Sequence, residues 1–366
     1  MKKQLAILLV CIFLFTGVMP VFATEDAGYQ AKSIVLMDAA TGHVLYEKKG
    51  DTKRFPASIT KIMTTICALD KLNLDDKITI SENAVNSLEY DAAIIGISAG
   101  DEINVEDALY ALLLSSANEI ANALAEAASG SVEDFASYMN TKAQQLGCKN
   151  THFVNPSGLH DEEHYTTAND MALITQAALT YDFFREAASA QAYETMETTF
   201  GETFQLQQHH KMVLKNKNLY DYAYYEYAEG GKTGYTSMAK NTLMTYAKDP
   251  QGRELICIVL RAPDDKAAYN DTKQLFEYGY NEYDWSQVKS QEQIEAEEEA
   301  ARAAAIAEEE ARIAAEEEKN SFSFFGFLGR LILVALIIGI CYIGGKAYHE
   351  KLERERERLR IHRPRQ

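Results

Sequence analysis

The sequence predicts an α/β or α+β domain whose sheet is assembled from both ends of that domain. Short apolar runs at 33–38 and 43–46, joined through Gly42, are typical of a β-hairpin. Further apolar or β-rich runs return much later, at 242–247 and 254–261. Because helical patterns lie between the two groups, the strands are expected to meet in one sheet that the helices cover.

Five helices are expected. Apolar residues recur at the spacing of one helix face in 58–70, 105–114, 118–128 and 133–146. A further helix-like segment, 265–279, follows the last strand. With 47% hydrophobic and 10% aromatic residues, the chain carries enough apolar surface to exclude intrinsic disorder for this part.

The N-terminal residues 1–23 are set apart from this fold. Lys2 and Lys3 precede an apolar run at 5–15, and small residues follow. That layout is typical of a cleavable secretory signal. We therefore expect the folded part to occupy residues 24–290, as one large domain or two small ones packed closely.

The region after the domain predicts a spacer and a membrane anchor. Residues 291–320 are rich in Ala and Glu without Pro or Gly, which predicts a solvated, monomeric helical stalk rather than a dimerising coiled coil. Residues 321–346 are mostly apolar and approach the ~20 residues that span a bilayer, although Arg330 interrupts them. The basic tail, 347–366, is expected in the cytoplasm. The domain would then lie outside the cell membrane; a buried core helix is the alternative.

Composition limits the partners. The formal net charge of −18 argues against nucleic acid, because phosphate binding needs clustered Lys and Arg. The expected domain contains three cysteines, Cys67, Cys148 and Cys257, and an odd number cannot form a complete disulfide framework. Apolar residues surround Cys67 and Cys257 in the sequence, which predicts buried free thiols. No cysteine cluster suggests a metal site, and no cofactor is expected.

A Ser-x-x-Lys motif opens the first predicted helix. Ser58 follows a loop that contains proline, so it would lie in the first helical turn, where free N–H groups favour developing negative charge. Lys61 lies on the same helix face. A lysine takes a serine proton only if burial or a second cation lowers its pKa. On its own, the motif is more often a helix cap followed by a surface lysine.

Two further polar motifs follow. Where two apolar helices meet, Ser116 offers a hydroxyl for proton transfer and Asn118 an amide for a substrate carbonyl, although an ordinary helix cap is the alternative. Later, glycines surround Lys232 and Thr233, which lets a ligand approach the backbone and supplies a cation and a hydroxyl for an anionic group. A plain glycine turn would also fit this last pattern.

Other histidines are interpreted as structural. His160 and His164 stand four residues apart, as in some zinc helices, but they follow an Asn-Pro-Ser-Gly loop and lack the glutamate directly after the first histidine. We expect a loop role for them and no metal. The pair His209 and His210 is expected at the surface.

In this order, the Ser-x-x-Lys, Ser-x-Asn and Lys-Thr-Gly motifs resemble those of the active-serine penicillin-binding proteins. The segments 145–160 and 165–171 are similar to the low-molecular-weight serine-type D-alanyl-D-alanine carboxypeptidases. The resemblance covers about residues 30–285. It implies a β-lactamase/transpeptidase-like domain, with an antiparallel sheet packed by helices and a helical subdomain.

The resemblance implies an acyl-transfer enzyme of peptidoglycan. Ser58 would attack the bond between the two terminal D-alanines of a stem peptide, with Lys61 as general base and Ser116 as proton relay. The N–H groups of Ser58 and Tyr235 would stabilise the oxyanion. Water would release the acyl-enzyme, which removes D-alanine and limits cross-linking of the cell wall. β-Lactams would trap Ser58, because they acylate it and deacylate slowly.

Substrate binding is implied in the same way. Lys232 and Thr233, with Gly234 beside them, would hold the substrate carboxylate, and Asn118 would orient the substrate's amide. The family also has a basic residue past the last long strand, for which Lys266 is the nearest candidate.

The chain departs from the family pattern in places. Members often carry a small β-rich domain before the anchor, whereas here the acidic helix takes its place. Their usual anchor is an amphipathic surface helix rather than a spanning one. Glu119 stands after Asn118 where Asp is usual, and Tyr235 is a variant after Lys-Thr-Gly.

Two other functions compete with the carboxypeptidase. A β-lactamase would use the same residues around the serine, but no Glu-x-x-Leu-Asn loop lies between Ser116 and Lys232 to deacylate it rapidly. A non-catalytic wall-binding ectodomain would fit the anchor and tail, but the intact motifs argue against it.

Overall fold

The computed structural model describes residues 28–88, 92–214 and 220–361 of the chain. The expected signal, residues 1–23, lies outside the described residues. The chain divides into two compact units, the first ending at Lys289 and the second beginning at Ser290.

Among the described residues, the first unit contains the strands and every helix except the last. Its strands are β1 (Ser33–Asp38), β2 (Val44–Lys48), β3 (Lys77–Thr79), β4 (Glu102–Asn104), β5 (Ala192–Glu194), β6 (Gln205–Gln207), β7 (Ala228–Thr236), β8 (Lys240–Lys248) and β9 (Glu254–Ala262). Its α-helices are α2 (Lys61–Leu69), α3 (Glu82–Asn86), α4 (Val105–Leu114), α5 (Asn118–Ser129), α6 (Val132–Gln145), α7 (Ala168–Ala178), α8 (Asp182–Ser189) and α9 (Asp265–Glu277). Shorter turns of helix are η1 (Ala57–Thr60), η2 (Tyr278–Glu282) and η3 (Trp285–Gln287).

The main sheet joins the two ends of this unit, as the sequence predicts. Within the described residues its strand order is β2-β1-β9-β8-β7, and every neighbouring pair is antiparallel. The hairpin of β1 and β2 turns at Gly42, whose φ of 72° is the left-handed conformation that glycine adopts most readily. On its other side, β1 pairs with β9, the last strand in the sequence, which follows it by more than two hundred residues.

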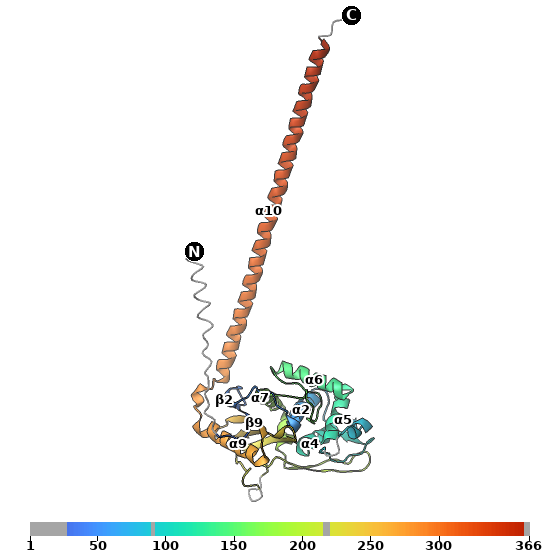
Figure 1. Ribbon diagram of the computed structural model, residues 1–366, viewed down its shortest axis with the longest axis vertical. Coiled ribbons are helices and arrows are strands. Elements are labelled where there is room, and N and C mark those ends of the chain that lie inside the picture. Colours follow the sequence, from blue (N-terminus) through green and yellow to red (C-terminus); the bar gives the residue numbers. More distant parts are fainter. Residues whose placement is uncertain (1–27, 89–91, 215–219, 362–366) are drawn as a thin grey trace. The chain divides into compact units, whose positions relative to one another are not determined.

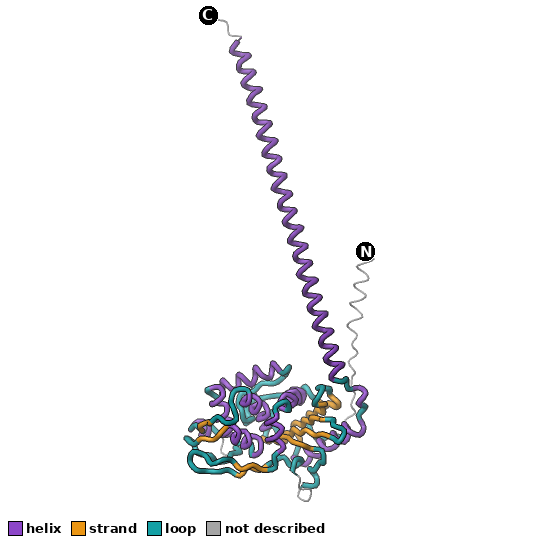
Figure 2. The backbone as a smooth tube through the Cα atoms, turned by 180° about the vertical axis from the view of Figure 1, so that it is seen from behind, coloured by secondary structure: helices purple, strands orange, loops and turns teal. Residues whose placement is uncertain are grey.

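Helices cover both faces of this sheet. Successive residues of β1 point to opposite faces, so Val35 packs into one core cluster and Ile34 into the other. The first cluster includes α2, α4, α5 and α6, which Figure 1 shows grouped together, and the second includes α9. Figure 2 shows the strands from behind, with helices around them. Burial on both faces explains why every residue of β1 is buried.

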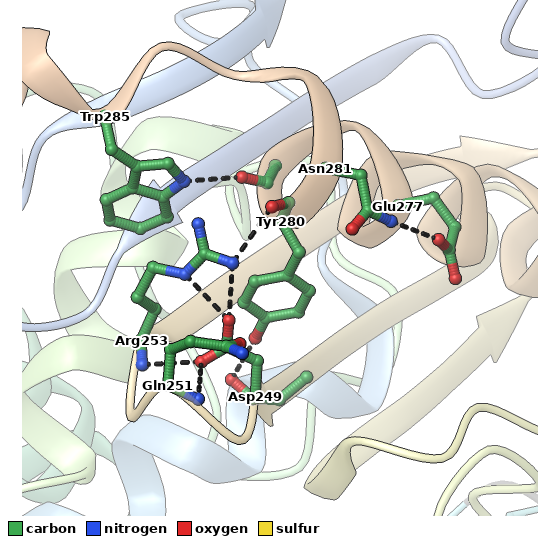
Figure 3. A network of polar contacts seen from close by, with 9 residues as sticks. Asp249, Gln251, Arg253, Glu277, Tyr280, Asn281 and Trp285 are labelled. Atoms are coloured by element: carbon green, nitrogen blue, oxygen red, sulfur yellow. Dashed lines mark hydrogen bonds and ion pairs between the residues drawn. The ribbon is translucent and has the colours of Figure 1, made fainter.

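The turn between β8 and β9 is tied to the segment that follows α9 (Figure 3). Arg253 pairs with Asp249 at 2.6 Å and donates to the Tyr280 carbonyl oxygen at 2.9 Å. The Tyr280 hydroxyl donates to the Ala247 carbonyl oxygen at 2.6 Å. The guanidinium also lies over the Trp285 ring, 4.9 Å from its centroid. These contacts hold η2 and η3 against the β8–β9 turn. This turn lies at the opposite end of the sheet from the β7–β8 turn.

The second unit is one helix, α10 (Gln291–Ile361). Within it, Gly326–Arg356 is long and apolar enough to cross a membrane, with a mean hydropathy of 2.3 in its most apolar window. Large apolar side chains such as Leu331 and Ile340 are exposed along it. The sequence places the apolar segment slightly earlier, at 321–346.

Candidate active site

Ser58 lies in η1, one turn before α2 begins at Lys61. The residue before it, Ala57, adopts a left-handed φ of 51°, an uncommon conformation for a residue with a Cβ atom. η1 has no side-chain cap, so its first N–H groups are not taken by a capping side chain. Ser58 itself is half-buried and lines a pocket. The segment thus presents a hydroxyl and free backbone donors at the start of a helix.

Lys61 is fully buried and surrounded by oxygen atoms. Its Nζ lies 2.7 Å from Asn118 Oδ1, 2.7 Å from the Ser157 carbonyl oxygen and 3.1 Å from Ser58 Oγ. The first two atoms can only accept hydrogen bonds. A neutral amine has two N–H groups, which those two acceptors occupy. Its lone pair is then left for the Ser58 hydroxyl, so this geometry orients the amine as a base toward Ser58.

Burial lowers the pKa of Lys61 well below its usual value, and the positive charge of Lys232 lowers it further. The negative charge of Glu119 acts in the opposite direction. Burial also lowers the pKa of Lys232, to about 7. The two lysines predicted by the motifs are therefore both held in a site that disfavours their charged forms.

Ser116 has an unusual position between α4 and α5. Its φ is 59°, and its buried Oγ has no hydrogen-bond partner within the described residues. It lines the same pocket as Ser58. A strained residue with an unsatisfied hydroxyl is uncommon in a protein interior and is typical of functional sites.

Asn118 and Glu119 begin α5 and hold the neighbouring loop. The Asn118 side chain is engaged by Lys61, and its N–H donates to the Ala93 carbonyl oxygen at 2.8 Å. Glu119 is buried, and its Oε1 accepts from the N–H groups of Ile95 and Gly96, at 2.6 and 3.0 Å. Burial raises the Glu119 pKa. Glu119, noted in the sequence only as a departure from the family pattern, thus fixes a loop that lines the pocket.

The sequence assigns no chemical role to the Asn155-Pro-Ser-Gly loop, yet this loop supports the serine and the lysine. Asn155 Oδ1 accepts from the N–H groups of Ser157 and Gly158, at 3.2 and 2.7 Å, which fixes the turn that presents the Ser157 carbonyl to Lys61. Thr64 Oγ1 donates to the Pro156 carbonyl oxygen at 2.6 Å. The sequence marks this loop only as part of the segment 145–160 that is similar to the family. It gives no sign of the contact with Lys61, because every residue type has a backbone carbonyl.

His164 also supports this helix. Its Nδ1 accepts from the Val154 N–H at 3.2 Å, so Nε2 carries the proton and donates to Thr60 Oγ1 at 2.9 Å. Burial lowers its pKa to about 3, which keeps the ring neutral. His164 therefore has a structural role, as expected: its hydrogen bond to Thr60 connects the 160–164 loop to η1.

β7 contributes the Lys-Thr-Gly motif, and it lies directly beside the serine. A Cβ atom on Gly234 would be 2.8 Å from the Ser58 nitrogen and 2.4 Å from Thr242 Oγ1, so only glycine allows this approach. Thr233, Gly234 and Tyr235 line the pocket with Ser58. Lys232 is buried, and its Nζ donates to the Thr233 carbonyl oxygen at 3.2 Å.

The expected surface position of His210 is wrong, although His209 is exposed. His210 is fully buried, because its Nε2 donates to the Met244 carbonyl oxygen at 3.1 Å and its ring fills the space left by Gly231. Burial lowers its pKa to about 3. A neutral ring thus packs beside the strand that carries Lys232.

Ser58, Ser116 and the Thr233–Tyr235 segment line a pocket of about 240 Å³, whereas Lys61, Asn118 and Lys232 are buried and do not line it. Its lining residues are Ser58, Ala93, Ser116, Thr233, Gly234, Tyr235, Asn241, Thr242, Leu243, Asp265, Ala268 and Tyr269. Lys266, the candidate basic residue, is exposed and does not line this pocket, whereas its neighbour Asp265 does. The free thiols Cys67 and Cys257 are buried as predicted, away from the pocket lining.

Comparison with known proteins gives one consistent result. A family model described as D-alanyl-D-alanine carboxypeptidase matches residues 20–264. The chain is 34% identical to the D-alanyl-D-alanine carboxypeptidase DacF of Bacillus subtilis over 78% of its own length and 72% of that protein's. It is 32% identical to DacC of Escherichia coli, over 73% and 66% of the two lengths.

Solved structures agree with the sequence comparison. The Streptomyces K15 DD-transpeptidase aligns with a TM-score of 0.64 and 29% identity, covering 70% of this chain and 99% of that one. A D-alanyl-D-alanine carboxypeptidase of Mycobacterium tuberculosis aligns with a TM-score of 0.63 and 25% identity, over 71% and 95%. The sheet and helices of the first unit therefore have the architecture of these proteins.

Proposed function

Because the chain belongs to the D-alanyl-D-alanine carboxypeptidase family, a family of serine-type hydrolases, we propose that it removes the terminal D-alanine from peptidoglycan stem peptides through an acyl-enzyme on Ser58. The observation that supports this best is the set of contacts around Lys61. Two acceptors occupy its N–H groups and leave the lone pair for Ser58 Oγ, 3.1 Å away. No cofactor or metal takes part in the proposed reaction.

In the first step, Ser58 Oγ attacks the carbonyl carbon between the two D-alanines while its proton passes to Lys61 Nζ. Lys61 accepts this proton because its pKa is lowered by burial. The backbone N–H groups of Ser58 and Tyr235 stabilise the oxyanion, each donor contributing on the order of 3 kcal/mol. The close approach of Gly234 to the Ser58 nitrogen supports this pairing of donors.

In the second half of acylation, the bond between carbon and nitrogen breaks and the leaving D-alanine takes up a proton. Ser116 is proposed to relay it, since its hydroxyl lines the pocket and has no partner among the described residues. Lys232 and Thr233 hold the substrate carboxylate. Asn118 is proposed to orient the substrate's amide, while its Oδ1 accepts from Lys61 at 2.7 Å. Water then attacks the ester and regenerates Ser58.

β-Lactams are proposed to acylate the same serine and to leave it slowly. A fluorescent penicillin should therefore label the full chain, and the label should persist through a denaturing gel. Ser58→Ala should lose both the label and the release of D-alanine from a D-Ala-D-Ala peptide. Rapid turnover of penicillin would favour a β-lactamase instead, and a folded wild-type protein that neither binds covalently nor cleaves would favour a wall-binding module.

We further propose that α10 anchors the enzyme in the cell membrane through Gly326–Arg356, with the catalytic unit on the extracytoplasmic side. Support comes from the apolar length of this segment and from the basic residues at its C-terminal end. The N-terminal signal and the cytoplasmic position of the tail belong to the same proposal. Protease protection of a C-terminal tag in intact spheroplasts, with digestion after lysis, is the expected result.

A further inference from the structure

A second pocket lies at the end of the main sheet where β7 turns into β8. Its volume is about 210 Å³. The residues that line it are Lys53, Arg54, Phe55, Glu162, Tyr165, Ala239 and Arg261. Three of these are cationic and one is anionic. Phe55 leads directly into the Pro56-Ala57-Ser58 segment, so this pocket borders the segment that carries Ser58.

The three cations have no carboxylate partner among the described residues. Arg54 donates through Nε to Ser33 Oγ at 3.1 Å, and Arg261 donates to the Met238 carbonyl oxygen at 3.4 Å. Lys53 lies over the Tyr165 ring, 3.9 Å from its centroid. Burial lowers the pKa of Arg54, and the positive charge of nearby Arg261 lowers it further. Two guanidinium groups that repel each other without a counter-ion favour binding of an anion.

Arg261 is held in an unusual conformation. Its φ of 58° lies in the left-handed region, which glycine adopts readily and residues with a Cβ atom adopt rarely. The residue is exposed, so core packing does not explain why an arginine stands here. The left-handed φ coincides with a β-bulge, because the β8–β9 register shifts between Asn241 and Leu243, and bulges are common next to functional sites, where they redirect a side chain.

The direction of the bound substrate leads to this pocket. The proposed function places the substrate carboxylate at Thr233 and the reacting carbonyl at the N–H of Tyr235. Upstream residues of the peptide then follow β7 toward the β7–β8 turn, which contains Met238 and Ala239. β7 ends at Thr236 and the turn 237–239 follows, so Ala239, four residues after Tyr235, lies within about 14 Å of it even for a fully extended chain; the turn shortens this distance, which two or three upstream peptide residues can cover.

We propose that Lys53, Arg54 and Arg261 form a subsite for a carboxylate that the stem peptide carries two or three residues upstream of the reacting D-alanine. This inference rests on the proposed function and adds a substrate preference to it. Glu162, in the same pocket, opposes the anion and limits the affinity. The subsite selects acidic peptides over amidated ones.

Two peptides test the subsite: Glu-(acetyl-Lys)-D-Ala-D-Ala and the same peptide with Gln in place of Glu. For the full chain in detergent, kcat/KM should be about fivefold higher for the acidic peptide, the size expected for a solvent-accessible charge pair, and higher salt should reduce the ratio. Arg261→Gln should bring the ratio close to one, and Arg261→Lys should largely keep it. Glu162→Gln should raise it.

Controls separate this proposal from the function on which it rests. Cleavage of the Gln peptide and labelling by fluorescent penicillin should be unchanged in all three variants, because none of these residues belongs to the catalytic machinery. A wild-type ratio near one, or an equal loss for both peptides in Arg261→Gln, would overturn the subsite and leave the carboxypeptidase intact. Failure of the wild type to cleave either peptide or to bind penicillin would overturn both proposals.

Discussion

Gly158 packs so closely against Ala57 that a Cβ atom at Gly158 would lie 1.9 Å from the Ala57 carbonyl oxygen. Both residues are in the left-handed region, with φ of 82° and 51°. The contact joins the loop that presents the Ser157 carbonyl to the segment that precedes Ser58. Ser58 and the Ser157 carbonyl that accepts from Lys61 are therefore positioned by one backbone-to-backbone contact.

Substitution of Gly158 by alanine should disrupt this contact. The added Cβ must displace the Ala57 carbonyl, so we expect penicillin labelling to slow by at least tenfold and the melting temperature to fall. Gly252→Ala is the matched control, because Gly252 has the same sign of φ, 84°, with no described atom within 4 Å of its Cβ position. It should cost only about 1 kcal/mol of stability and leave labelling unchanged. Equal effects of the two substitutions would contradict the role given to the contact.

The pH dependence of cleavage should have an alkaline limb near pH 7. Below that pH, Lys232 is charged and can hold the substrate carboxylate; above it, the buried amine is neutral and binding weakens. The limb should appear in kcat/KM, which reports the free enzyme. In Lys232→Arg, the guanidinium stays charged, and any residual activity should no longer fall between pH 7 and 9. An unchanged limb in that variant would assign it to another group.

Removal of the buried charge should stabilise the protein while it abolishes substrate binding. The folded protein releases the Lys232 proton near pH 7 and the unfolded chain near 10.5, so burial of the charge destabilises the fold fully below pH 7, and this effect disappears as the pH rises toward 10.5. Lys232→Met should raise the free energy of unfolding by about 1–2 kcal/mol at pH 6. The difference from wild type, followed by chemical denaturation, should shrink at pH 9.5.

Glu119 should act through its oxygen atom rather than through its charge. Its Oε1 accepts two backbone N–H groups of the 95–96 segment, and an amide oxygen can do the same. Glu119→Gln should therefore retain activity within a few-fold. Glu119→Ala should leave two N–H groups without their acceptor, lower the melting temperature and raise KM, because the loop that carries Ala93 lines the pocket. A severe loss in the Gln variant would show that the charge is required.

The sequence predicts β1, β2, β8 and β9, the five helices α2, α4, α5, α6 and α9, and the motif residues, because each has a local signal, but it misses α3, α7 and α8. Periodicity identifies α4 and α5, and the glycines around Lys232 mark the close approach of β7. Contacts made by the backbone have no such signal: any residue type at position 157 would offer the same carbonyl to Lys61. The surface position that the sequence predicts for His210 is wrong for a related reason, since its burial depends on the space that Gly231 leaves on a strand about twenty residues away.

Pairing of β1 with β9 has a consequence for the order in which the enzyme can be made. Ser58 and Lys61 are synthesised early, but β7 and β8, which contact η1, follow them by more than 160 residues, and the sheet is complete only after residue 262 has been added. A ribosome that has produced the first two hundred residues has produced the nucleophile without the strand that faces it. If Ser58 acts as proposed, its site cannot be assembled during most of translation, and we expect a chain truncated before β9 to be inactive.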